Sequence, residues 1–197
     1  MSTLNYHHGD LRGALLHAAE GLLRDVGPAE LSLRAVARRA GVSAMAPYRH
    51  FADKDALLAG VAADGFDQFA RRLRQATATG HDPRSALTAQ GQAYILFARD
   101  EPALFRLMFG PIISGASAID ALRAAGAPAY AVLQDAVVAF RPDTDPSARE
   151  DLTLACWALV HGLACLIVDG NICQHLTGSD IEAQTARILD LLLQDRP

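Results

Sequence analysis

The chain has little of what marks several protein classes. Aromatic residues make up only 6% of its 197 residues, and its three cysteines are too few for a disulfide framework, which indicates a reduced compartment. Internal repeats and low-complexity segments are absent, so solenoid and fibrous classes are excluded. The longest uncharged apolar run, 152–168, falls short of the roughly 20 residues that a membrane span needs. Because the first ten residues are polar, we expect no signal peptide but a cytoplasmic protein with no membrane partner.

Apolar residues are abundant and recur with a helical period. They make up 51% of the chain, charged residues make up 20%, and the mean hydropathy is +0.12, which excludes a wholly disordered chain. No segment alternates convincingly between apolar and polar residues as a half-buried strand does. We therefore expect an all-α protein of eight or nine helices, in two parts that meet where the composition shifts near 80–83.

The two parts differ in charge. Residues 1–80 carry ten basic and eight acidic side chains, net +2, whereas residues 81–197 carry eight basic and fourteen acidic side chains, net −6. Such a difference indicates different partners for the two halves, although +2 is also the charge of an ordinary solvated surface.

Capping residues and turn glycines predict where the helices begin and end. Asp10 caps a first helix that Gly27-Pro28 ends, Ser32 caps a second, Ser43 a third that continues to about His50, and Asp53 a long fourth helix that reaches about Thr79. Further helices are predicted near 84–99, 102–109, 117–140, 147–168 and 180–194. The sequence Ala125-Gly126-Ala127-Pro128 is expected to kink or split the helix at 117–140.

The segment 32–54, SLRAVARRAGVSAMAPYRHFADK, has the pattern of a helix-turn-helix. The small residues Ala37 and Ala40 allow close packing of the second short helix, Gly41 makes the turn, and Val42 fills the space between the two helices. The second helix is expected to present Ala44, Met45, Pro47, Tyr48 and His50 outward, with Ala46 and Phe51 packing inward. Exposed Met and Tyr beside basic residues suit a helix that lies in a DNA major groove.

These residues, with YHHGDLR at 6–12 before them and DALL at 55–58 after them, make the chain resemble the TetR family of bacterial transcriptional regulators. The resemblance implies a DNA-binding domain at 9–69 and a homodimer that places the 43–50 helices in successive major grooves of a palindromic operator. Carried over residue by residue, Ser32, Arg34 and Lys54 would meet phosphates, Ser43 would start the recognition helix, Ala44, Met45 and Pro47 would face bases, and Tyr48 and His50 would touch backbone or bases.

The second half carries a further resemblance, in FRLMFG at 105–110 and WALVHG at 157–162, to a TetR subgroup with a Trp-His-Gly signature. It implies a C-terminal effector-binding and dimerisation domain at 83–195. The run 154–168 has no charge and is apolar all round, so it needs cover on more than one side, and with the 180–194 helix it would form a four-helix dimer interface. The candidate effector-binding residues are Tyr94, Phe97, Phe105, Met108, Phe109, Tyr130, Trp157 and His161, although residues of these types are more often plain core.

Together these features predict a small-molecule-released repressor that is not an enzyme, with no catalytic residue, metal site or cofactor. Four alternatives stay open. Cys165 lies one turn from His161, but a catalytic pair would need a third, orienting group. Cys156, Cys165, Cys173 and His175 could sense a metal, or Cys173 could sense redox state. A chain of this kind could also act through protein contacts alone, against which the intact 32–54 segment speaks.

Overall fold

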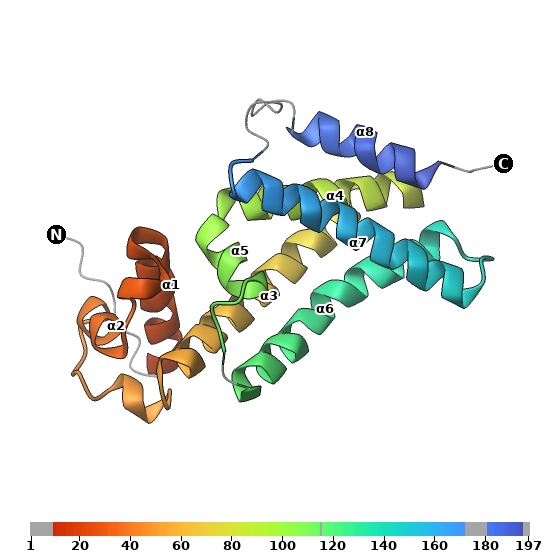
Figure 1. Ribbon diagram of the computed structural model, residues 1–197. Coiled ribbons are helices and arrows are strands. Elements are labelled where there is room, and N and C mark those ends of the chain that lie inside the picture. The colour runs from red at the N-terminus through yellow and green to blue at the C-terminus, as the bar shows by residue number, and fades with distance from the viewer. Residues whose placement is uncertain (1–9, 115, 172–180, 195–197) are drawn as a thin grey trace.

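The computed structural model describes residues 10–114, 116–171 and 181–194, and in these ranges all regular secondary structure is helical (Figure 1). This confirms the predicted all-α fold. The elements are α1 Leu11–Glu30, α2 Leu33–Arg39, the 3₁₀ turn η1 Pro47–Arg49, α3 Lys54–Thr77, α4 Pro83–Asp100, α5 Pro102–Phe109, α6 Ala116–Phe140, α7 Pro146–Val168 and α8 Ile181–Leu193. Figure 1 shows α1 and α2 at one end of the molecule, α8 at the other, and α3 running between them.

The first two helices begin at the predicted residues, but α1 continues past the predicted end at Gly27-Pro28 to Glu30. The Asp10 carboxylate accepts a hydrogen bond from the Gly13 N–H at 2.8 Å, and the Ser32 hydroxyl accepts one from the Ala35 N–H at 3.2 Å. Gly27 interrupts α1 with a φ of 77°, a left-handed conformation that favours glycine. α2 ends at Arg39, Gly41 follows the cap residue Ala40 with a φ of 69°, and the Val42 N–H donates to the Ala37 carbonyl at 3.0 Å. This pattern is a Schellman cap, and it turns the chain into the next segment.

The prediction of a helix over 43–50 is wrong, because within this range the structure has only the 3₁₀ turn η1. The Ala46 N–H donates to the Ser43 carbonyl at 2.9 Å, and the Arg49 N–H donates to the Ala46 carbonyl at 3.3 Å. Pro47 has no N–H, so the α-helical bond back to Ser43 cannot form and the tighter i to i+3 pattern takes its place. Ser43 therefore contributes its backbone carbonyl to this turn, as the acceptor for the Ala46 N–H.

Helix α3 belongs to both parts of the molecule. Asp53 caps it as predicted, with its carboxylate 2.8 Å from the Ala56 N–H. Its 24 residues span about 36 Å. It packs on α1 of the first part and on α4, α5 and α6 of the second, and buried side chains occur along the whole helix, from Leu57 to Leu73. Any tilt of α3 therefore moves both parts of the molecule.

Helix α6 is a single helix from Ala116 to Phe140, so the predicted split at 125–128 is wrong. Pro128 lies inside it, on a side exposed to solvent, and Ala124, one turn earlier, is exposed as well. Water can therefore reach the Ala124 carbonyl that Pro128 leaves without its helical donor. Gly126 faces the other way, where an added Cβ would lie 3.3 Å from Phe66 of α3. The missing side chain lets α6 approach α3 closely.

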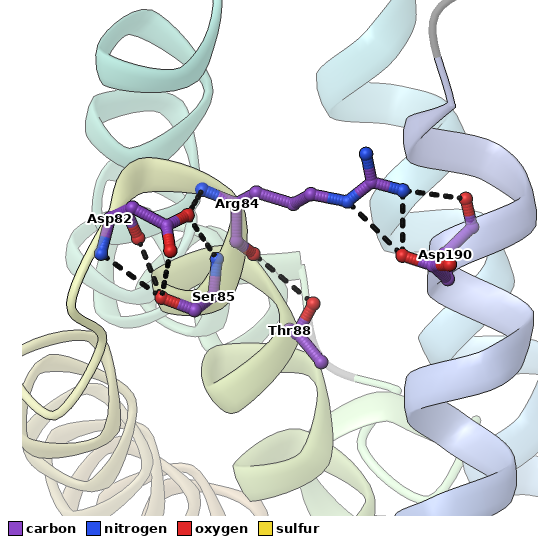
Figure 2. A network of polar contacts seen from close by, with 5 residues as sticks. All are labelled: Asp82, Arg84, Ser85, Thr88 and Asp190. Atoms are coloured by element: carbon purple, nitrogen blue, oxygen red, sulfur yellow. Dashed lines mark hydrogen bonds and ion pairs between the residues drawn. The ribbon is translucent and has the colours of Figure 1, made fainter.

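Helices α7 and α8 cover α4, and polar contacts tie α8 to it. Figure 2 shows Asp82 and Ser85, which form a capping box at the start of α4. Arg84, in the same first turn, reaches across to Asp190 of α8. The Arg84 guanidinium binds the Asp190 carboxylate with a shortest N–O distance of 2.6 Å. The first turn of α4 is thereby joined to the last turn of α8.

Helix α7 is long and apolar enough to cross a membrane by length and composition, yet it packs here against α4, α6 and α8. Thr153, Cys156, Val160 and Ala164 face those helices and are buried. The opposite side, with Leu154, Ala158, Gly162 and Leu166, is exposed. The described chain thus leaves one apolar face of α7 uncovered.

Candidate nucleic-acid interface and ligand cavity

The 43–50 segment presents apolar and polar side chains together at one end of the molecule. Met45 is 67% exposed and Tyr48 is 44% exposed, large fractions for such side chains, and Ser43, Ala44 and His50 are exposed as well. Ala46 and Phe51 are buried as predicted. The prediction that Pro47 faces outward is wrong, because Pro47 is among the most completely buried side chains. The 3₁₀ turn directs its ring into the core beside α2.

Polar and basic side chains surround this exposed segment. Arg34 on the first turn of α2 is exposed, and so is Ser32, which caps that helix. Lys54 is the only lysine in the sequence. It is half-buried at the start of α3, and its ammonium group donates to the Ala29 carbonyl at 3.3 Å. An ammonium group has three donors, so this bond leaves others for a phosphate.

A cavity of about 470 Å³ lies in the second part of the molecule, within the size range of small-molecule sites. Six helices form its wall, with α3, α4 and α6 contributing most of it. The wall consists of Phe66, Phe69, Leu73, Leu87, Gln90, Gly91, Tyr94, Met108, Phe109, Ile119, Leu122, Arg123, Gly126, Ala127, Ala129, Tyr130, Leu133, Cys156, Trp157, Val160 and Leu189. Nearly all of these side chains are apolar or aromatic.

Five of the eight predicted effector-binding residues lie on this wall: Tyr94, Met108, Phe109, Tyr130 and Trp157. The other three do not lie on the wall, so the prediction that they line the cavity is corrected: Phe97, Phe105 and His161. Phe97 packs on Phe69 with ring centroids 5.0 Å apart, and Phe105 packs on Phe109 at 4.9 Å. Both rings are buried in the core, one layer behind the wall.

His161 lies behind Tyr94 in a chain of hydrogen bonds. The Tyr94 hydroxyl is 2.8 Å from His161 Nδ1, and His161 Nε2 is 3.5 Å from Cys165 Sγ. Burial lowers the pKa of His161 and raises the pKa of Tyr94, so both groups are held neutral. With Tyr94 donating to Nδ1, the Nε2 proton points at the sulfur.

Sequence reasoning missed the contribution of α3 and of Gln90 to the cavity. Phe66, Phe69 and Leu73 continue the apolar stripe of α3 into the second part of the molecule, and this spacing was the available signal. Gln90 falls between Leu87 and Tyr94 on one apolar stripe of α4. A polar residue inside such a stripe signals a buried hydrogen-bonding site.

The described part of the chain holds no cluster of metal-binding side chains. There, no three His, Cys, Asp or Glu side chains lie close enough to hold a metal ion. Cys156 is buried, and burial raises its pKa to about 11. Cys173 and His175, candidates for metal or redox sensing, lie outside the described residues.

Comparison with known proteins identifies both parts. Residues 15–61 match the family of bacterial regulatory proteins of the tetR type, and residues 87–192 match the tetracyclin repressor-like C-terminal domain. The second match alone covers more than half of the chain. The chain belongs to the TetR family. It is a transcriptional regulator with a DNA-binding helix-turn-helix, and the exposed 43–50 segment of this TetR protein lies within the residues that match the DNA-binding family.

Three known proteins illustrate the similarity in sequence or in fold. A protein of unknown function from Rhodococcus sp. RHA1 is 31% identical, with a TM-score of 0.82 over 96% of both chains. The HTH-type transcriptional activator FasR from Mycolicibacterium smegmatis is 35% identical over 98 residues, which are 50% of this chain and 45% of FasR, so the match spans less than half of that relative. The transcriptional regulator FadR from Bacillus subtilis, solved in complex with stearoyl-CoA, shares the fold at 13% identity, with a TM-score of 0.75 over 93% of this chain and 98% of FadR.

Proposed function

We propose that this TetR-family protein is a homodimeric, cytoplasmic repressor that binds a palindromic operator and is released by a small-molecule effector. It would act through binding and not through catalysis. The operator-contacting residues would be Ser32, Arg34, Ser43, Ala44, Met45, Tyr48, His50 and Lys54, and Pro47 would support them from beneath. The effector would occupy the cavity bounded by Tyr94, Met108, Phe109, Tyr130 and Trp157.

The observation that carries the proposal is that one helix, α3, serves both sites. Its first residue, Lys54, lies at the DNA-binding end, while Phe66, Phe69 and Leu73 farther along form part of the cavity wall. A ligand that pushes on these rings would tilt α3 and change the separation of the two recognition elements in a dimer. Because successive major grooves fix that separation near 34–36 Å, a shift of a few ångströms would abolish simultaneous binding of both half-sites.

The dimer is proposed to form through α7 and α8. Leu154 is 54% exposed, Leu166 is 41% exposed, and Leu191 on α8 is 67% exposed. Exposed leucines in this number on two adjacent helices favour a partner surface over solvent. A symmetric pair of α7–α8 units would cover them as a four-helix interface.

The effector is proposed to be largely apolar, because the cavity wall is largely apolar. FadR, which shares the fold, binds stearoyl-CoA, a molecule with a long apolar chain. The relative FasR is an activator, so the sign of regulation has to be measured separately from DNA binding.

The first experiment is a fluorescence-anisotropy titration of the purified protein against duplexes tiled from the DNA that flanks its gene. We expect saturable binding to one tile at about 0.15 M salt, with two subunits or a multiple of two per site. Weak binding that is equal on all tiles and lost in salt would contradict the proposal. Transcription in vitro from the promoter beside that tile would then separate a repressor, which lowers transcript yield, from an activator, which raises it.

A further inference from the structure

Gln90 is a buried polar side chain on an apolar cavity wall. It lies on α4 and is only 3% exposed, and Leu87, Gly91 and Tyr94 of the same helix flank it on the wall. Burying an amide among apolar groups costs free energy unless its donors and acceptor are hydrogen-bonded. The partners of Gln90 therefore bear on what the cavity holds.

Within the described residues the Gln90 side chain makes one hydrogen bond. Its Nε2 donates to Thr77 Oγ1 of α3 at 3.2 Å, and Thr77 in turn donates to the Leu73 carbonyl at 2.9 Å. A primary amide offers two N–H donors and an oxygen with two lone pairs. The bond to Thr77 uses one donor. Because no side-chain nitrogen or oxygen in the described residues is both fully buried and unpaired, the amide oxygen keeps contact with the cavity space. Exchanging the oxygen and nitrogen positions would still leave one polar atom directed there.

The surroundings of Gln90 favour a neutral ligand group over an ionised one. Among the wall residues that the structure describes, Arg123 is the one with a charge. Its side chain is 79% exposed and lies 3.4 Å from the Asp120 carboxylate, so it belongs to the rim and already faces an anion. A carboxylate or ammonium group placed beside Gln90 would be buried without an opposite charge, which is strongly unfavourable.

We infer that Gln90 is a specificity-determining residue of the effector cavity, and that the effector carries one uncharged hydrogen-bonding group, a hydroxyl, ketone or amide, on an otherwise apolar body. The inference rests on the proposed function, since it presumes that the cavity binds an effector. A polar site of this kind rejects a ligand that lacks the matching group, because the buried amide is then left unpaired. A plain hydrocarbon chain seated against Gln90 would bind less well than the same chain with a hydroxyl group.

The test compares two ligands of equal size, octan-1-ol and 1-chlorooctane, which differ in hydrogen-bonding ability at one end. Trp157 is the only tryptophan of the chain and lies on the cavity wall, so its intrinsic fluorescence reports occupancy. We expect the wild-type protein to bind the alcohol at least about tenfold more tightly than the chloride. In Gln90→Met, which has similar volume and no amide, this preference is expected to disappear.

Thr77→Val is the matched control, because it removes the protein partner of Gln90 and leaves the amide in place. A preference for the alcohol that survives in Thr77→Val and is lost in Gln90→Met supports the inference. The wild-type comparison stands by itself if Gln90→Met fails to fold, as judged by circular dichroism. Equal affinity of the wild type for both ligands, or a preference that persists in Gln90→Met, overturns the role of Gln90 and leaves the effector cavity standing. Failure of both ligands to bind at their solubility limits overturns the effector cavity itself, and the inference with it.

Discussion

The hydroxyl of Tyr94 on α4 lies 2.8 Å from Nδ1 of His161 on α7, and it joins the cavity wall to the layer behind it. The Tyr94 ring is on the cavity side, and the imidazole lies against the rings of Phe105 and Phe109, with centroids 5.6 Å and 5.1 Å away. His161 is thus a partly buried, neutral group that positions the wall residue Tyr94. Among the described residues it forms no ion pair.

This burial predicts that His161 makes folding sensitive to mild acid. Because burial lowers the pKa of His161 below 6.5, the unfolded chain binds the proton more readily than the folded one. The stabilisation is fully present above about pH 6.5 and is lost as the pH falls toward the folded-state value. We expect the free energy of unfolding to fall less between pH 7 and pH 5 in His161→Gln than in the wild type, as measured in urea. His17→Gln, at an exposed histidine of α1, is the control, and equal pH dependence in wild type and His161→Gln would contradict the prediction.

Tyr48 and Lys54 are predicted to contribute differently to operator binding. Tyr48→Ala should weaken specific binding about tenfold, because it removes an exposed contact of the recognition element. Lys54→Ala should weaken binding almost equally on all sequences and reduce the salt slope by about 1. Arg74→Ala removes a charge from the far end of α3 and serves as control in the same anisotropy titration. Wild-type affinity in both Tyr48→Ala and Lys54→Ala would show that the recognition surface is assigned wrongly.

The uncovered face of α7 is predicted to hold the dimer together. Replacing Leu166 by Gln should weaken dimerisation by at least about tenfold in sedimentation equilibrium, since it places an amide in an apolar interface. Val26→Gln is the matched control, because Val26 is 49% exposed on α1, away from this face. If both variants dimerise like the wild type, the interface lies elsewhere.

A substitution at Gly162, on the same face, should affect the stability of the chain and the dimerisation in opposite directions. An added side chain there meets no atom within 4 Å, so Gly162→Leu should stabilise the helix by about 0.8 kcal/mol. In a dimer that packs α7 closely, the same leucine should hold the partner helix away and raise the dissociation constant. A variant that is both more stable and equally dimeric would argue against close packing at Gly162.

Gly41 is predicted to be required for the geometry of the turn after α2. Its φ of 69° lies in the left-handed region, so Gly41→Ala should lower the free energy of unfolding by about 1–2 kcal/mol. Gly41→Asn should lower it less, because asparagine tolerates this conformation better. Urea unfolding of both variants measures the difference. An alanine variant as stable as the wild type would mean that the Schellman turn has rearranged.

The cysteines on α7 are predicted to be poor redox sensors. Burial raises the pKa of Cys156 to about 11 and also raises the pKa of Cys165, so little thiolate is present at pH 8. In a Cys173→Ser background we expect iodoacetamide to modify Cys156 about 100-fold more slowly in the folded protein than in urea, as followed by mass spectrometry. Rapid modification of the folded protein at pH 8 would reopen redox sensing on this helix.

The sequence by itself determined the elements that depend on local geometry. The caps Asp10, Ser32 and Asp53 each accept a hydrogen bond from the backbone N–H three residues further along, and Gly41 has the left-handed conformation that a turn after a helix uses. These are interactions within one turn of chain, so residue type and spacing suffice to predict them. The helix bounds of the second part followed in the same way from periodicity and from proline and glycine.

Tertiary structure decided which way the side chains face. Met45 and Pro47 are two residues apart in the recognition element, and only packing against α2 makes one exposed and the other buried. Phe105 and Phe109 share one face of α5, yet of these two rings only Phe109 lies on the cavity wall, while Phe105 is buried behind it. Every member of an apolar stripe looks alike in sequence, because a stripe defines the buried side of a helix and not what it is buried against. The cavity lies between six helices, and the Gln90 amide borders it. Its shape depends on how these helices pack, which the sequence of any one segment does not determine.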